Sequence, residues 1–236
     1  MGRYSGKNAS TGCYNIFFGH DVASNGTITG NSNIAIGCEA SYKVSSGAHN
    51  VVLGTCALYC NQTCGFNVAI GHHAGKLTNG ACNVFIGVSA GEGCTGATGG
   101  NNIAIGTNAG LCTRSFSFNT HIGTAAGKCS SGEYNIFFGH QAGQGSSTVS
   151  NNTGGCNIFI GKQAGASVQD GNCNVFLGLC AGYKISSGNL NVAIGKEAGY
   201  CISTGVQNVF LGWEAGRKNT GEYSIAIGSK AGGLNT

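Results

Sequence analysis

The sequence predicts an all-β fold, a parallel β-solenoid of about 13 coils with about 17 residues each. Three observations support this prediction. A short motif recurs along nearly the whole chain, apolar residues alternate within it, and Gly fills 44 of 236 positions while Pro is absent. A fixed repeat this short is typical of solenoids, in which each repeat stacks on its neighbours. The prediction treats residues 1–236 as one repeat domain, with repeats starting near Asn15 and ending near Thr236.

The motif is clearest in residues 191–199, which read Asn-Val-Ala-Ile-Gly-Lys-Glu-Ala-Gly. The repeat Asn is present in every unit but the last, where Ser224 replaces it. Stacked amides can bond one another and the nearby backbone along a solenoid. The motif therefore predicts a structural Asn ladder. Its members are Asn15, Asn33, Asn50, Asn67, Asn83, Asn102, Asn119, Asn135, Asn157, Asn174, Asn191 and Asn208.

The three residues after each repeat Asn are predicted to form a strand. Its first and third positions are large and apolar in nearly every unit, as in Val192 and Ile194. Because residues two apart share one face of a strand, both columns are expected to line a common interior. The Gly that follows permits a backbone turn closed to other residues. The Ala of the Ala-Gly pair is expected to point inward at a corner.

The middle strand position is then expected to point outward, and six units place Phe there. A solitary solvated coil has no reason to expose so much apolar surface, so an outward Phe stripe predicts a contact between copies of the chain. The predicted subunit-interface residues are Phe17, Phe85, Phe137, Phe159, Phe176 and Phe210.

The charge pattern excludes several classes of partner. Only 8% of residues are charged, the net charge is +4, and the basic residues are scattered. Such scatter does not fit a nucleic-acid site or a polybasic membrane anchor. No apolar run approaches the roughly 18 residues of a membrane span, and the first residues lack the apolar core of a signal peptide. We expect a soluble protein with no nucleic-acid partner and no membrane insertion.

The 13 cysteines are an odd number, which argues against a complete set of internal disulfides. They recur at equivalent places in the repeat; Cys82, Cys156 and Cys173, for example, each precede a repeat Asn. This recurrence favours buried, reduced thiols that act as small apolar fillers. Cross-links between some adjacent coils remain the alternative.

The sequence predicts no catalytic residue, no metal site and no cofactor. Glu197 and Glu214 share a repeat position on adjacent coils, about 4.8 Å apart. A polysaccharide-cleaving solenoid needs two carboxylates about 5–10 Å apart, but a solvated surface column explains this pair more simply. The cysteines of residues 56–64 and the pair His72-His73 match no zinc-binding spacing. An ice-binding face would need an outward ladder of one small residue, and the position after the repeat Gly varies too much.

Residues 221–231 read Gly-Glu-Tyr-Ser-Ile-Ala-Ile-Gly-Ser-Lys-Ala, and residues 33–37 and 102–106 both read Asn-Ile-Ala-Ile-Gly. These stretches resemble the YadA-like head repeats of trimeric autotransporter adhesins and similar repeats in phage tail-fibre proteins. The resemblance implies a left-handed β-roll, three chains side by side and an adhesive surface. The adhesin repeat is shorter, keeps the middle position small and belongs to a protein with a secretion signal, stalk and anchor. These departures and the many cysteines favour a viral fibre or another extracellular appendage.

The sequence therefore predicts a non-enzymatic structural and adhesive fibre segment on a virion or extracellular appendage. The expected partners are further copies of the chain as a homotrimer, end-to-end neighbours in the fibre, and a host-surface glycan or protein. A self-polymerising extracellular filament is the first alternative. A polysaccharide-degrading spike or an ice-binding solenoid is the second.

Overall fold

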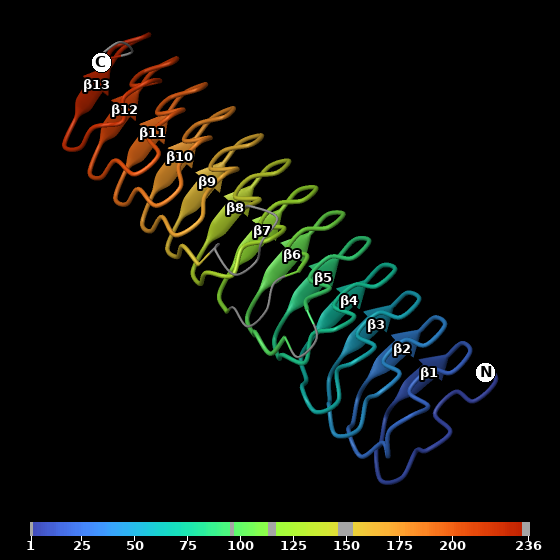
Figure 1. The fold of residues 1–236 in the computed structure, drawn as a ribbon. Helices are drawn as coiled ribbons and strands as arrows, with labels where there is room; N and C mark the ends of the chain where they lie inside the picture. The colour runs from blue at the N-terminus through green and yellow to red at the C-terminus, as the bar shows by residue number, and fades with distance from the viewer. Residues whose placement is uncertain (1, 95–96, 113–116, 146–152, 233–236) are drawn as a thin grey trace. The chain divides into compact units, whose positions relative to one another are not determined.

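A computed structural model describes residues 2–94, 97–112, 117–145 and 153–232, and each coil contributes one strand of three residues (Figure 1). The strands are β1 (Ile16–Phe18), β2 (Ile34–Ile36), β3 (Val51–Leu53), β4 (Val68–Ile70), β5 (Val84–Ile86), β6 (Ile103–Ile105), β7 (Thr120–Ile122), β8 (Ile136–Phe138), β9 (Ile158–Ile160), β10 (Val175–Leu177), β11 (Val192–Ile194), β12 (Val209–Leu211) and β13 (Ile225–Ile227). The predicted all-β, parallel β-solenoid with coils of about 17 residues is confirmed. Its handedness stays a prediction.

The chain divides into two compact units, which we call the N-terminal unit (residues 1–118, β1 to β6) and the C-terminal unit (residues 119–236, β7 to β13). Within each unit every strand pairs in parallel with the strand that follows it in sequence. Each unit also has its own hydrophobic core. The description of residues 1–236 as one domain stays a prediction.

The orientation of the strands was predicted wrongly. The middle strand position lines the interior, whereas the first and third positions face outward. Ala35 and Val52 are fully buried, while Ile16 and Phe18 on either side of Phe17 are 56% and 58% exposed. A strand of three residues turns either one or two side chains inward. These coils are narrow, and one inward strand side chain is enough to fill them together with the corner Ala and the loop residues.

The six Phe predicted to form a subunit interface are therefore interior residues. Five of them are fully or almost fully buried, and Phe17 is partly buried against the core of the N-terminal unit. In the C-terminal unit the rings of Phe137, Phe159 and Phe176 stack with centroids 4.9 Å apart. His121 continues this column with its ring centroid 5.0 Å from that of Phe137. Side chains shielded within their own chain cannot contact another copy.

Gly stands six residues after five of the six Phe positions and makes room for their rings. A Cβ atom on Gly165 would lie 2.5 Å from the ring of Phe159, which is too close for any side chain. Where the middle residue is Val52, the residue six positions later is Leu58, also buried. Gly also stands six residues after Ala69, Ala104 and Ala193, so this pattern by itself does not mark the Phe rings as interior.

The Gly that ends each strand stands where coils approach most closely. Gly195 has a φ of 131°, and a Cβ there would overlap the carbonyl oxygen of Gly212 on the next coil. Both the left-handed backbone and the contact require Gly, so the predicted turn is confirmed. The following Ala is fully buried in both coils, at Ala198 and Ala215, as expected for an inward corner.

The repeat Asn side chains also point inward and form a ladder of hydrogen bonds. The Oδ1 atom of Asn191 accepts bonds from both the backbone N–H and the side-chain Nδ2 of Asn208, each at 3.0 Å. The Nδ2 atom of Asn191 donates to Oδ1 of Asn174 at 3.0 Å and to the carbonyl of Gly205 at 2.8 Å. A fully buried amide is thus satisfied entirely by its neighbours, which is a structural role.

Candidate functional site

The outward side of the strands is a continuous apolar surface in each unit. We call the side chains at the first and third strand positions the strand face. Every one of these positions holds Ile, Val, Leu or Phe, except Thr120. In-register pairing places like residues side by side, as in Val175, Val192 and Val209 of β10 to β12. The strand face is thus a regular array of aliphatic side chains about 4.8 Å apart between coils.

Solvent reaches a large part of this array. Ile136 and Phe138 of β8 are 44% and 52% exposed, and Ile225 and Ile227 of β13 are 74% and 66% exposed. Exposed aromatic residues border it, including Tyr134 and Tyr223, which directly precede the repeat Asn135 and its replacement Ser224. Single exposed apolar residues are normal, but a contiguous patch marks an interaction surface. The strand face, rather than the Phe stripe, is therefore the apolar surface open to a partner.

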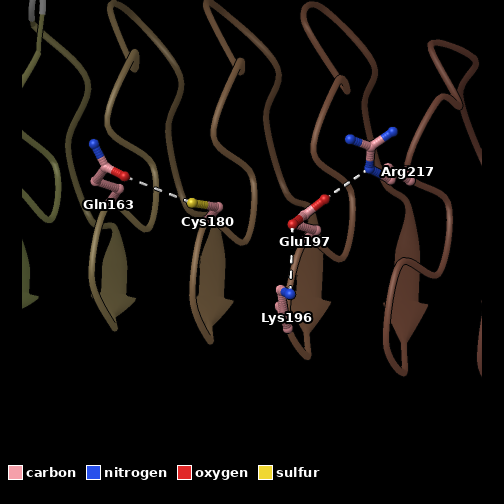
Figure 2. A network of polar contacts seen from close by, with 5 residues as sticks. All are labelled: Gln163, Cys180, Lys196, Glu197 and Arg217. Carbon is pink, nitrogen blue, oxygen red and sulfur yellow. Dashed lines mark hydrogen bonds and ion pairs between the residues drawn. The ribbon is translucent and has the colours of Figure 1, made fainter.

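A polar column runs along the C-terminal unit at the second position after the repeat Gly (Figure 2). Cys180 Sγ donates to Gln163 Oε1 at 3.7 Å. Arg217 Nε donates to Glu197 Oε2 at 2.8 Å, and Lys196 Nζ lies 4.0 Å from Glu197 Oε1. The hydrogen bond to Glu197 raises the pKa of Arg217.

Glu214 occupies the same column on the next coil, where its N–H donates to the carbonyl of Lys196 at 2.9 Å. Glycoside hydrolysis needs one carboxyl group that gives up a proton and a second that acts as nucleophile or base. Glu197 is instead engaged with Arg217 and Lys196 as an ion pair. The assignment of the two glutamates to a solvated surface column stays a prediction.

All 13 cysteines are free thiols, but most are not the buried fillers that the sequence predicted. Cys129 alone is buried, and Cys82, Cys156 and Cys173 are exposed beside the strand face. The residue before each repeat Asn faces outward because the Asn itself faces inward. Burial and a hydrogen bond to Glu39 raise the pKa of Cys56 to about 11, so this group remains a thiol at neutral pH.

One surface feature that the sequence reasoning missed occurs once in each unit. In the N-terminal unit the rings of Tyr42 and Tyr59 stack at 4.8 Å with an interplanar angle of 12°. Lys43 Nζ lies 5.7 Å from the centroid of Tyr59, and Lys76 occupies the Tyr position of the next coil. We call these four residues the N-terminal tyrosine cluster.

The C-terminal tyrosine cluster repeats this arrangement with Tyr183, Lys184, Tyr200 and Arg217. Its two rings stack at 5.1 Å with an interplanar angle of 10°. Lys184 Nζ and Arg217 Cζ lie 5.8 Å and 5.2 Å from the centroid of Tyr200. Burial, followed by the charge of neighbouring groups, raises the pKa of Tyr59 and of Tyr200, so both hydroxyls are protonated at neutral pH. Reading the fifth position after the repeat Gly as a column would have revealed both clusters.

His72 and His73 stack at 3.7 Å, but their surroundings do not suit a metal ion. Lys76 Nζ lies 3.3 Å from Nε2 of His73, and a carboxylate oxygen of Glu92 lies 3.6 Å from Nδ1. Burial and the adjacent Lys76 lower the pKa of His73. Within the described ranges no three His, Cys, Asp or Glu side chains gather to hold a metal. The same ranges contain no helix long and apolar enough to cross a membrane.

Comparisons with protein-family models, with curated proteins and with solved structures found no match to this chain. The resemblance to adhesin heads and tail-fibre repeats stays a prediction. The strand face and the tyrosine clusters are the two surface features that bear on function.

Proposed function

We propose that the chain is a non-enzymatic structural and adhesive fibre segment that assembles as a homotrimer through the strand face. The observation that carries this proposal is the exposed aliphatic array on β1 to β6 and on β7 to β13. The backbone N–H and C=O groups of the strands are used by the parallel pairing between coils. The outward apolar side chains have no such partner within the coil, and another copy of the same chain supplies a matching apolar surface.

The size of the array supports a stable contact. In the C-terminal unit seven side chains of the strand face are more than a third exposed. Complete burial of one large aliphatic side chain contributes about 1.5–3 kcal/mol, and the strand face holds many that are only partly buried.

A trimer is favoured over an open assembly because closed rotational symmetry covers every strand face without sideways growth. The resemblance to trimeric adhesin heads supports the same number of chains. Adhesion would follow from repetition, since a stiff array of equivalent coils presents weak sites in register whose contributions add through avidity. A place on a virion or an extracellular appendage, with end-to-end neighbours, belongs to this proposal.

The test is the mass of the purified protein in solution, measured by light scattering, with electron micrographs of the same sample. We expect discrete particles with three times the 23.7 kDa mass of the chain. A monomer would contradict self-association through the strand face. Dimers would agree with association through the strand face but would contradict a trimer. Long filaments would favour a self-polymerising structural filament.

A further inference from the structure

Cys156 and Cys173 occupy the same position of the repeat on adjacent coils of the C-terminal unit. Each directly precedes a repeat Asn, and 17 residues separate them in the sequence. Both are exposed free thiols. The other cysteines described in this unit, Cys129, Cys180 and Cys201, stand at other positions of the repeat. The stacking of the coils therefore places these two thiols side by side on the surface.

Hydrogen bonds fix the spacing of the two coils at this point. The N–H of Cys173 donates to the carbonyl of Gly155 at 3.0 Å, one residue before Cys156. One residue further on, the N–H and Nδ2 of Asn174 donate to Oδ1 of Asn157 at 2.9 Å and 3.1 Å. Paired coils lie about 4.8 Å apart. Two Cα atoms at equivalent positions therefore fall within the range of about 4.4–6.8 Å that disulfides span.

The two side chains leave their coils in the same direction, because Cys156 and Cys173 have nearly equal φ angles of 58° and 56°. Parallel side chains keep the two Cβ atoms about 4.8 Å apart, slightly beyond the roughly 3.5–4.5 Å of relaxed disulfides. A bridge would require the coils to approach by less than about 1 Å. Strain of this kind makes a disulfide easier to reduce. The geometry thus suits a reversible bridge better than a permanent one.

We propose that Cys156 and Cys173 form a reversible disulfide between adjacent coils by exchange with a small-molecule disulfide such as oxidised glutathione. One thiol loses its proton to water, and its sulfur attacks the small disulfide, which forms a mixed disulfide and releases one glutathione thiolate. The second thiol, also deprotonated, attacks the protein sulfur of the mixed disulfide and expels the other glutathione as a thiolate. Both thiolates take up protons. Two protein thiols are thus oxidised while one glutathione disulfide is reduced.

The bridge would tie the coil of β9 to that of β10 beside the strand face. It would link two coils of one chain, so it does not depend on the proposed trimer. The redox state of the surroundings would then determine whether these coils are joined covalently.

Cys82 provides an internal control in the N-terminal unit. It is exposed at the same position of the repeat, but this position holds Phe66 on the coil before and Asn101 on the coil after. The N–H of Cys82 donates to the Gly65 carbonyl at 3.1 Å, and the N–H of Asn101 donates to the Ala81 carbonyl at 3.0 Å, so the three coils are adjacent. Glutathione attached to Cys82 meets no thiol at the equivalent position and should stay attached.

The test is treatment of the folded full chain with oxidised glutathione, followed by alkylation of the remaining thiols, digestion with trypsin and mass spectrometry. Cleavage after Lys162 separates Cys156 from Cys173, so the bridge appears as two peptides joined by a disulfide. We expect the joined peptides in the wild type, their loss on addition of excess reduced glutathione, and glutathione attached to Cys82. Cys173→Ser should abolish the joined peptides and leave glutathione on Cys156. Cys180→Ser removes the other thiol of the same tryptic peptide and should retain the bridge.

The proposal is overturned if Cys156 and Cys173 of the wild type both retain glutathione or both remain reduced, because the coil spacing would then keep the sulfurs apart. A disulfide that joins two copies of the chain would also overturn it. Electrophoresis without reductant separates these cases, since a bridge within one chain leaves the 23.7 kDa mass of the denatured chain undoubled. Light scattering tests the assembly separately. Monomers with the bridge reject only the trimer, and trimers without the bridge reject only this inference.

Discussion

At the scale of single residues, the narrow interior decides what each position tolerates. His121 is fully buried in the inward column, where its ring stacks on that of Phe137. Burial lowers the pKa of its imidazole to about 3. The folded state therefore favours the neutral ring, while the unfolded chain takes up a proton near the ordinary value of 6.5. The stability that depends on neutral His121 is present above about pH 6.5 and is lost as the pH falls towards 3.

We expect His121→Phe to remove this acid sensitivity. The free energy of unfolding of the wild type should fall relative to that of the variant by about 1.4 kcal/mol per pH unit below pH 6.5. At pH 4.5 the difference should reach about 2–3 kcal/mol. Denaturant unfolding at pH 7 and pH 4.5 measures it, with substitution of exposed His140 by Phe as the control. Equal pH dependence of wild type and His121→Phe would reject the argument.

The strand-ending Gly gives a second prediction at this scale. Gly195→Ala introduces a Cβ against the carbonyl of Gly212 at a φ of 131°. Because neither the backbone nor the adjacent coil can move freely, we expect a loss of about 3 kcal/mol or more in unfolding free energy. At Gly221 a Cβ would meet only Asn219 Oδ1 at 3.2 Å and Ser224 Oγ at 3.9 Å. Gly221→Ala should cost less than about 1 kcal/mol, and similar losses at both positions would contradict the steric explanation.

At the scale of the coil, the Asn ladder joins each strand to the next. Asn174 links Asn157 below it to Asn191 above it and also donates to the carbonyl of Gly188. A second, exposed Asn ladder runs two residues earlier, where Asn172 bonds to Asn189. Both ladders follow from the same register, but only the inner one lacks water as an alternative partner. Burial therefore determines how much each amide matters.

We expect Asn174→Ala to lower the free energy of unfolding by about 2–4 kcal/mol, because it leaves buried backbone groups without partners. Asn172→Ala removes an exposed amide of the same type and should cost less than about 1 kcal/mol, since water can replace its bonds. Denaturant titration of the two variants side by side provides the measurement. Equal costs would mean that the inner ladder contributes no more than its solvent-exposed counterpart.

At the scale of the whole molecule, the proposed trimer depends on the strand face. Ile160 and Ile194 both point outward from the strands of the C-terminal unit and are 39% and 41% exposed. A charge there would be costly to bury between copies but harmless on a solvated surface. Glu in place of Lys184 lies outside the strand face, so its charge would not be buried between copies and would carry no such cost.

Ile160→Glu combined with Ile194→Glu is therefore expected to shift the proposed trimer to monomer at micromolar concentration, with unchanged circular dichroism. Lys184→Glu, which lies outside the strand face, should leave the mass unchanged. Light scattering over a dilution series measures the particle mass of both variants. A trimer that survives the two Glu substitutions would place the subunit contact elsewhere on the coil.

The sequence by itself determined the repeat length, the position of every strand, the Gly turns and the Asn ladder. These features depend on local backbone geometry and on a register that repeats from coil to coil. Alternation shows which residues share a face of a strand, but it does not show which face is inside. The closed path of the coil settles that question, because only the tertiary structure shows how the turns at positions such as Gly195 and Ala198 direct the chain around its interior.

Because alternation does not show which face of a strand is inside, the other predictions about inward and outward residues also differ from the structure. The inward Phe column, the outward cysteines and the exposed aliphatic array all follow once the direction of curvature is known. The tyrosine clusters depend on residues 17 positions apart that meet only when the coils stack. Local chemistry therefore determined the coil, whereas the side of each strand that meets solvent, and with it the surface open to a partner, was decided by the tertiary structure.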